Sequence, residues 1–141
     1  MQLFRWSKTH EVYLPEIDAE HRQLFQRGSE LYKAILAGAE PDRVSALLTD
    51  LLQAATDHFE REERLMRSAG FPSLVWHRQQ HDAVRKRVAE CTARVAAGES
   101  EARVELLKFL SSWLCDHTSV ADRMMGAYIR NWQRRERALA S

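Results

Sequence analysis

The chain has 141 residues, which suits one domain with a buried core of its own. Its 21 Lys and Arg nearly balance its 20 Asp and Glu, and the resulting formal charge of +1 argues against nucleic acid as a partner. No stretch comes near the roughly 18 apolar residues of a membrane span, and we find no secretory signal.

Residues 1–17 are predicted to form an irregular arm before the first helix. Asp18 is the expected N-cap of the first helix, because its side-chain oxygen can accept a hydrogen bond from a free backbone N–H. That helix should end near Gly38, and Pro41 should open the second helix.

Three further helices and an amphipathic extension follow. Apolar residues recur with helical spacing over residues 44–66, 77–95, 106–117 and 121–132. Gly70 and Gly98 should end the second and third helices. The arginine-rich segment 130–137 is interpreted as a solvated helix face, with a docking surface for a protein partner as the alternative.

Four long amphipathic helices joined by short turns predict an all-α, up-down-up-down four-helix bundle. We expect a single domain over residues 1–141, made of the arm 1–17, the bundle 18–122 and a C-terminal helical extension 123–141. Cys91 and Cys115 are too few for a disulfide scaffold, and two free thiols favour a cytoplasmic location.

Five of the six histidines lie in phase with the apolar stripes of their helices: His21, His58, His77, His81 and His117. Glu62 follows His58 by four residues and His81 follows His77 by four, so each pair stacks on one helix face. A single such residue is usually an ordinary hydrogen-bonded core residue. Five histidines on four helices, however, predict a metal pocket, because buried polar groups are costly unless they are paired or bound.

Asp122 completes the set but does not fit an ideal helix. It follows His117 by five residues, which is a turn of about 140°. The two side chains therefore cannot share one face of a continuous α-helix. We expect a bulge, kink or helix restart near Thr118 and Ser119.

The ordered fragments resemble the hemerythrin family in its single-domain bacterial form, over nearly the whole chain from Phe4 to Met125. They are Trp6, I-D-A-E-H (17–21), H-F-E-R-E-E-R-L-M (58–66), F-P and H-R-Q-Q-H within 71–81, and W-L-C-D-H-T-S-V-A-D (113–122).

The resemblance implies a centre of two non-haem iron ions with an oxo or hydroxo bridge that binds O2 reversibly. It implies that Glu62 and Asp122 bridge the irons, that His77, His81 and His117 hold one iron, and that His21 and His58 hold the other. One coordination position then stays open, on the iron with two histidines, and the resemblance places O2 there.

Several functions remain open at this point. The first is O2 storage, delivery or sensing by a monomer without enzymatic activity. A di-iron enzyme acting on peroxide or nitric oxide is the second, and an iron- or redox-sensing interaction module is the third. A structural zinc site is the weakest, because seven ligands exceed the usual four. The E-x-x-H pair of ferritin-like oxidases does not occur in the sequence.

Two positions depart from the family pattern. Thr118 stands where relatives often have an aliphatic residue, and a hydroxyl facing the pocket could bond the bound oxygen species or admit water. Tyr13 stands where relatives commonly have glycine, and we interpret it as a packed or exposed arm residue. The following apolar residues could shield the metals or simply pack the core: Leu24, Phe25, Phe59, Met66, Trp113 and Leu114.

Overall fold

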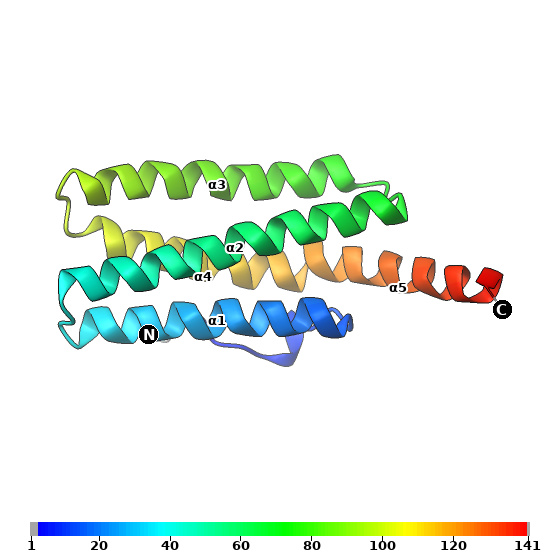
Figure 1. Cartoon of the computed structure of the whole chain (residues 1–141), viewed down its shortest axis with the longest axis horizontal. Coiled ribbons are helices and arrows are strands. Elements are labelled where there is room, and N and C mark those ends of the chain that lie inside the picture. The colour runs from blue at the N-terminus through cyan, green and yellow to red at the C-terminus, as the bar shows by residue number, and fades with distance from the viewer. Residues whose placement is uncertain (1–2, 141) are drawn as a thin grey trace.

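The computed structural model describes residues 3–140, and within that range the chain is helical with no strand. The elements are η1 (Lys8–His10), α1 (Pro15–Leu36), α2 (Pro41–Ala69), α3 (Leu74–Ala96), α4 (Ala102–Ser119) and α5 (Ala121–Ala140). Helices α1 to α4 run up, down, up and down around a common core, and α5 continues from α4 along the same side (Figure 1). The predicted four-helix bundle is confirmed.

Glycine ends the first three helices close to the predicted places. Gly38, Gly70 and Gly98 have φ angles of 73°, 66° and 90°, in the left-handed region that glycine adopts at low cost. After α2, the Phe71 N–H donates to the carbonyl of Met66 at 3.0 Å, which satisfies one of the last carbonyls of the helix.

The predicted start of the first helix is wrong. Helix α1 begins at Pro15, whose fixed φ and missing N–H suit the first helical position. Asp18 therefore lies inside the helix. Its carboxylate accepts hydrogen bonds from the backbone N–H groups of Val12 at 2.8 Å and Tyr13 at 3.1 Å, so it holds the arm rather than the helix end.

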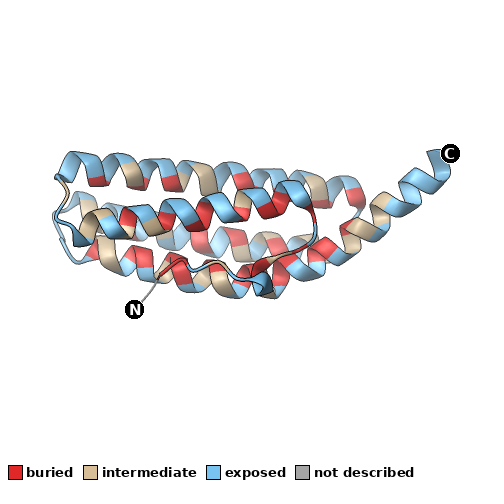
Figure 2. Cartoon of the chain, turned by 90° about the horizontal axis from the view of Figure 1, so that it is seen from below, coloured by how far each residue is buried: buried red, intermediate tan, exposed pale blue. Residues whose placement is uncertain are grey.

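The arm lies along the bundle and is attached at both ends (Figure 2). Near its beginning, the buried ring of Phe4 covers Gly28, where an added Cβ would come within 2.4 Å of the ring. Near its end, Arg123 donates to the carbonyl of Glu11 at 3.0 Å, and Arg130 donates to the carbonyl of Val12. The arm is thus a packed part of the fold.

The expected break between His117 and Asp122 is present as a helix restart. Helix α4 ends at Ser119, Val120 has φ −118° and ψ −72°, and α5 begins at Ala121. The hydroxyl of Thr118 donates to the carbonyl of Leu114 at 2.7 Å, and Ser119 donates to that of Cys115 at 2.8 Å. Such bonds to the carbonyl four residues back bend and weaken a helix end.

Two apolar clusters fill the bundle. The larger includes Leu24 and Phe59, and the smaller includes Ile17, Met66 and Met125. Along α1 and α2, the predicted metal ligands fall between these clusters. Buried residues follow the inner faces of the helices, whereas residues 134–140 of α5 are exposed and project past the bundle (Figure 2). Within residues 3–140, none of the helices has the length and apolar character needed to span a membrane.

Candidate metal centre

All seven predicted residues meet in one buried place. One group contains Glu62, His77, His81, His117 and Asp122, and a second contains His21, His58, Glu62 and Asp122. In each group the possible ligand atoms lie within 4.8 Å of one another. All seven side chains are buried, at most 4% exposed. Glu62 and Asp122 belong to both groups, so the site has two halves with shared carboxylates.

Glu62 divides its two carboxylate oxygens between the halves. Its Oε1 lies 3.3 Å from the Nε2 of His81 and 3.5 Å from that of His77. Its Oε2 lies 2.9 Å from the Nε2 of His58 and 3.3 Å from that of His21. A carboxylate in this position can bind two metal ions, one through each oxygen.

Asp122, in the first turn of α5, does the same. Its Oδ1 lies 2.9 Å from the Nε2 of His77 and 3.0 Å from that of His117, and its Oδ2 lies 3.1 Å from the Nε2 of His21. The helix restart at Val120 makes this possible, because it returns Asp122 to the inner face that His117 already occupies.

Three of the histidines are oriented by oxygen acceptors on the far side of the ring. The Nδ1 of His58 bonds Glu20 at 2.7 Å, that of His81 bonds Glu63 at 2.9 Å, and that of His117 bonds Gln80 at 2.8 Å. Carboxylate and amide oxygens accept hydrogen bonds, so each Nδ1 carries the hydrogen when the ring is neutral. Each Nε2 then presents a lone pair to the centre, as in histidines that bind metals.

The donor atoms of the site lie so close together that they are more favourably placed with metal ions between them than without. The Nε2 of His117 lies 3.2 Å from that of His81, and because the Nδ1 of each ring carries the hydrogen, two lone pairs face each other when both rings are neutral. The oxygens Oδ1 and Oδ2 of Asp122 and Oε1 of Glu62 are buried without a hydrogen-bond partner among the described residues. Cations between these atoms would relieve both problems. Nitrogen and carboxylate donors suit several transition metals.

The pKa shifts show how strongly these groups are coupled when no metal is bound. Burial lowers the pKa of His77, but the carboxylates of Asp122 and Glu62 close to its Nε2 outweigh burial and raise the pKa to about 9. Burial would raise the pKa of Glu62, yet His58 and its neighbours hold it well below its usual range. Asp122 is likewise held well below its usual range, because His117 and His21 outweigh burial and the charge of Glu62.

Aromatic rings cover the three-histidine half. Phe59 stacks on His81 with ring centroids 4.2 Å apart, and Trp113 stacks on His117 at 4.3 Å. Both were among the apolar residues singled out in the sequence. The two rings pack directly against two of the predicted ligands.

The residues that the sequence reasoning missed are the outer acceptors and one histidine. Glu20, Glu63 and Gln80 each stand next to a ligand in the sequence, but helical periodicity does not show which side chain of a neighbouring helix they meet. His10 is buried, and its Nδ1 donates to the Thr118 hydroxyl at 2.8 Å. The sequence gives no signal for it, because its neighbours Lys8, Thr9 and Glu11 are polar.

The two departures from the family pattern have structural explanations. The Thr118 hydroxyl is fully buried and engaged by both His10 and the carbonyl of Leu114. Tyr13 is 58% exposed, as interpreted, and has a φ of 62°. That left-handed backbone explains why glycine suits the position. Arg123 and Arg130 both lie over the Tyr13 ring.

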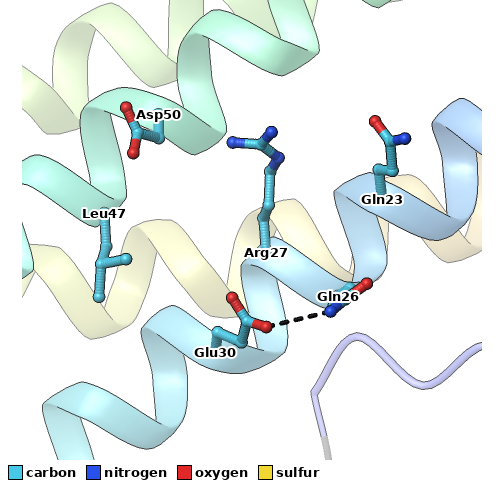
Figure 3. Close-up of a pocket in the computed structure, with 6 residues that line it drawn as sticks. All are labelled: Gln23, Gln26, Arg27, Glu30, Leu47 and Asp50. Carbon is cyan, nitrogen blue, oxygen red and sulfur yellow. Dashed lines mark hydrogen bonds between the residues drawn. The ribbon is translucent and has the colours of Figure 1, made fainter.

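A separate surface hollow of about 260 Å³ lies between α1 and α2 (Figure 3). Gln26 donates to Glu30 at 3.1 Å there, and Arg27 extends from α1 toward α2. The described residues that line this hollow include none of the seven predicted ligands. It is therefore not part of the metal centre.

Comparison with known proteins identifies the family. The model of the Hemerythrin HHE cation binding domain matches residues 13–129. A bacteriohemerythrin of Ralstonia nicotianae is 34% identical, with 99% of this chain and 100% of that protein covered. A bacteriohemerythrin of Clostridium acetobutylicum is 29% identical over 86% of this chain and 97% of its own length. A myohemerythrin of Theromyzon tessulatum is 28% identical, with coverage of 84% and 88%. With this match on the sequence and two clusters of metal-type donors inside a four-helix bundle, the chain belongs to the hemerythrin family.

Proposed function

We propose that the protein holds two non-haem iron ions and binds O2 reversibly. The observation that carries this proposal is the division of Glu62 and Asp122 between two groups of histidines. A mononuclear site would leave at least two histidines and half of each carboxylate unused. Membership of the hemerythrin family supports iron as the metal.

In this proposal His77, His81 and His117 hold one ion, and His21 and His58 hold the other. Glu62 and Asp122 would each supply one carboxylate oxygen to each ion. The smaller number of histidines on the His21–His58 side leaves room for an exchangeable ligand there. Two ferrous ions supply the electrons for reversible O2 binding when they are present.

Neighbouring residues keep the donor groups ionised and correctly oriented for metal binding. Glu62 and Asp122 stay ionised because the surrounding histidines lower their pKa, despite complete burial. Glu20, Glu63 and Gln80 fix the ring orientations of His58, His81 and His117. Phe59 and Trp113 keep water from the back of the site, which should slow irreversible oxidation of the metals.

An optical spectrum of the reduced, iron-loaded protein tests the proposal. A charge-transfer band should appear when O2 is added and disappear when O2 is removed by degassing. A second cycle on the same sample should reproduce the band. Direct passage to a stable ferric spectrum would contradict reversible binding.

One observation favours a second function, turnover of peroxide or nitric oxide. A polar cleft of about 170 Å³ between α1 and α2 reaches His58 and is lined by Glu20, Arg27, Asp57 and Arg61. It would let water and small polar molecules approach the two-histidine side. Consumption of hydrogen peroxide or nitric oxide faster than autoxidation would favour this function over O2 binding.

We also infer that the chain acts as one hemerythrin-like domain, monomeric and cytoplasmic. The arm supports the single-domain assignment, because it is fixed to both α1 and α5. The unpaired Cys91 and Cys115 support a reducing compartment. Sedimentation of the purified protein and fractionation of cells that produce it test these assignments.

A further inference from the structure

An apolar cavity lies beside the metal centre, between α2 and α3. Its volume is about 230 Å³. The inner wall includes the buried residues Leu24, Leu51 and Val84, whereas Thr56 and Ala89 at its outer side are exposed. The cavity therefore reaches from the protein surface into the core of the bundle.

The inner end of the cavity adjoins the predicted ligands. Phe59 and Trp113 line it, and these are the rings that stack on His81 and His117. Leu24, one turn beyond His21 on α1, lines it as well. A molecule in the cavity would be separated from the metal donors by a single layer of side chains.

Arg85 stands at the opening. Of the described residues that line the cavity, it alone is charged. Its guanidinium lies 5.5 Å from the centre of the Phe59 ring and donates to Glu63 at 2.8 Å and to Asp82 at 2.8 Å. Glu63 in turn accepts from the Nδ1 of His81. The same carboxylate thus holds both Arg85 and a predicted metal ligand.

The lining selects a class of occupant. Leucine, valine, alanine and aromatic side chains offer a guest van der Waals contact but almost no hydrogen bonds, so ions and strongly hydrated molecules are excluded. Enclosed apolar cavities of roughly 150 Å³ stay dry and bind benzene or xenon; this cavity has a lining of the same kind and an opening at Thr56 and Ala89. A volume of about 230 Å³ is ample for a diatomic gas but too small for large organic molecules.

From these contacts we propose that the cavity binds small apolar molecules and that Arg85, held by Glu63 and Asp82, covers its opening. The identification of O2 as the natural occupant rests on the proposed function. In that role O2 occupies the cavity first and reaches the two-histidine half past Leu24, one turn from His21, and movement of Arg85 controls its entry.

Xenon titration of the metal-loaded protein, followed by NMR, tests the cavity. Xenon should bind saturably and shift the methyl signals of Leu51 and Val84. Ala55→Leu should weaken xenon binding by about tenfold, because the new side chain takes the space and contacts of the guest. Ala89→Leu, at the exposed opening, provides a second test if the first variant does not fold.

Ala54→Leu is the matched control. Ala54 is the neighbour of Ala55 on α2 and is similarly half-buried, but it lines the polar cleft near His58 instead. The Ala54→Leu variant should bind xenon as the unchanged protein does. Absence of saturable xenon binding, or equal loss in both variants, would overturn the proposed cavity site.

Stopped-flow measurement of O2 association then tests the route. Ala55→Leu should slow association and Ala54→Leu should not; the opposite result would place the route in the polar cleft and overturn this part. Arg85→Ala should raise the association rate by about threefold, as expected when a covering group is removed. Arg78→Ala is its control, because Arg78 also contacts Glu63, at 3.5 Å, without lining the cavity. Equal rates in these two variants would overturn the role of Arg85.

The xenon result does not depend on iron chemistry. Saturable xenon binding in a protein that fails to bind O2 reversibly would overturn the proposed function and leave the cavity site standing. Reversible O2 binding without saturable xenon binding would overturn the cavity site and leave the proposed function standing.

Discussion

At the scale of single residues, the carboxylates and the histidines of the centre have different tasks. Each histidine directs one nitrogen into one half of the site, whereas Glu62 and Asp122 each direct one oxygen into each half. The loss of a carboxylate should therefore affect both metal ions, and the loss of a histidine should affect mainly one.

Glu62→Gln and His58→Ala separate these tasks. The glutamine variant should lose most of both ions, because its side chain no longer supplies a charged oxygen to either half. The alanine variant should keep the ion of the three-histidine half. Metal content per chain after gel filtration measures the difference. Equal loss in the two variants would contradict the bridging role of Glu62.

Thr118 contributes to stability through His10 rather than as a free hydroxyl. Thr118→Val leaves the buried Nδ1–H of His10 without an acceptor, which should lower the free energy of unfolding by about 1–3 kcal/mol. Urea denaturation measures this change. Thr49→Val is the matched control, because Thr49 makes the same bond to the carbonyl four residues back but is exposed. A comparable loss in both variants would remove His10 from the explanation.

At the scale of elements, the arm can pack closely against α5 because residue 126 is a glycine and has no side chain. An added Cβ at Gly126 would lie 2.7 Å from the carbonyl oxygen of Val12. Because backbone cannot move aside as a flexible side chain can, Gly126 lets the arm approach α5 closely. Arg123 and Arg130 then hold the arm from the same helix.

Gly126→Ala should loosen the arm. Alanine favours the helix by up to about 1 kcal/mol, but the clash with Val12 should cost more and give a net loss of about 1–2 kcal/mol. Thermal unfolding measures the net effect, and proteolysis should cut the arm faster. Met124→Ala, at a half-exposed position two residues away, should change neither. An increase in stability for Gly126→Ala would show that the arm yields easily.

The elements also show where sequence reasoning succeeds and where it stops. Gly38 and Gly70 end helices as predicted because their effect is local, and the five-residue step to Asp122 required a break that local geometry could foresee. Asp18 was assigned wrongly, since Pro15 and Asp18 both suit a helix start and the sequence does not rank them. The contacts of Glu63 and His10 with other elements depend on how helices are rotated against one another. Periodicity along one helix does not contain that information.

At the scale of the whole molecule, the site places ionised groups in the middle of the bundle. Metal ions balance the two carboxylates when they are bound. Without metal, protons on the histidines must do so, as the raised pKa of His77 indicates. The stability of the metal-free protein should therefore depend on pH, and metal should remove much of that dependence.

The pH range follows from the direction of the shifts. The pKa of His77 rises from 6.5 to about 9 on folding, so its contribution is complete below pH 6.5 and is lost as the pH rises through 9. Glu62 and Asp122 have lowered pKa values, and their contribution is lost as the pH falls well below 4. From pH 6.5 to 9 the metal-free protein should lose about 2–3 kcal/mol on account of His77. Urea denaturation at both pH values, with and without metal, measures this loss. An equal change in the free energy of unfolding with and without metal would contradict the prediction.

The restart at Val120 has a consequence for how the length of this chain can vary. The deletion of one residue near Val120 would allow α4 and α5 to join as one continuous helix, because a four-residue step turns a helix by about 40° rather than 140°. Asp122 could then still face the histidines, now four residues after His117. Gly126, Arg123 and Arg130 lie on the same helix as Asp122, so the contacts of the arm depend on the same rotation of α5. The step in sequence between His117 and Asp122 and the docking of the arm on α5 are therefore coupled, because both depend on the rotation of one helix.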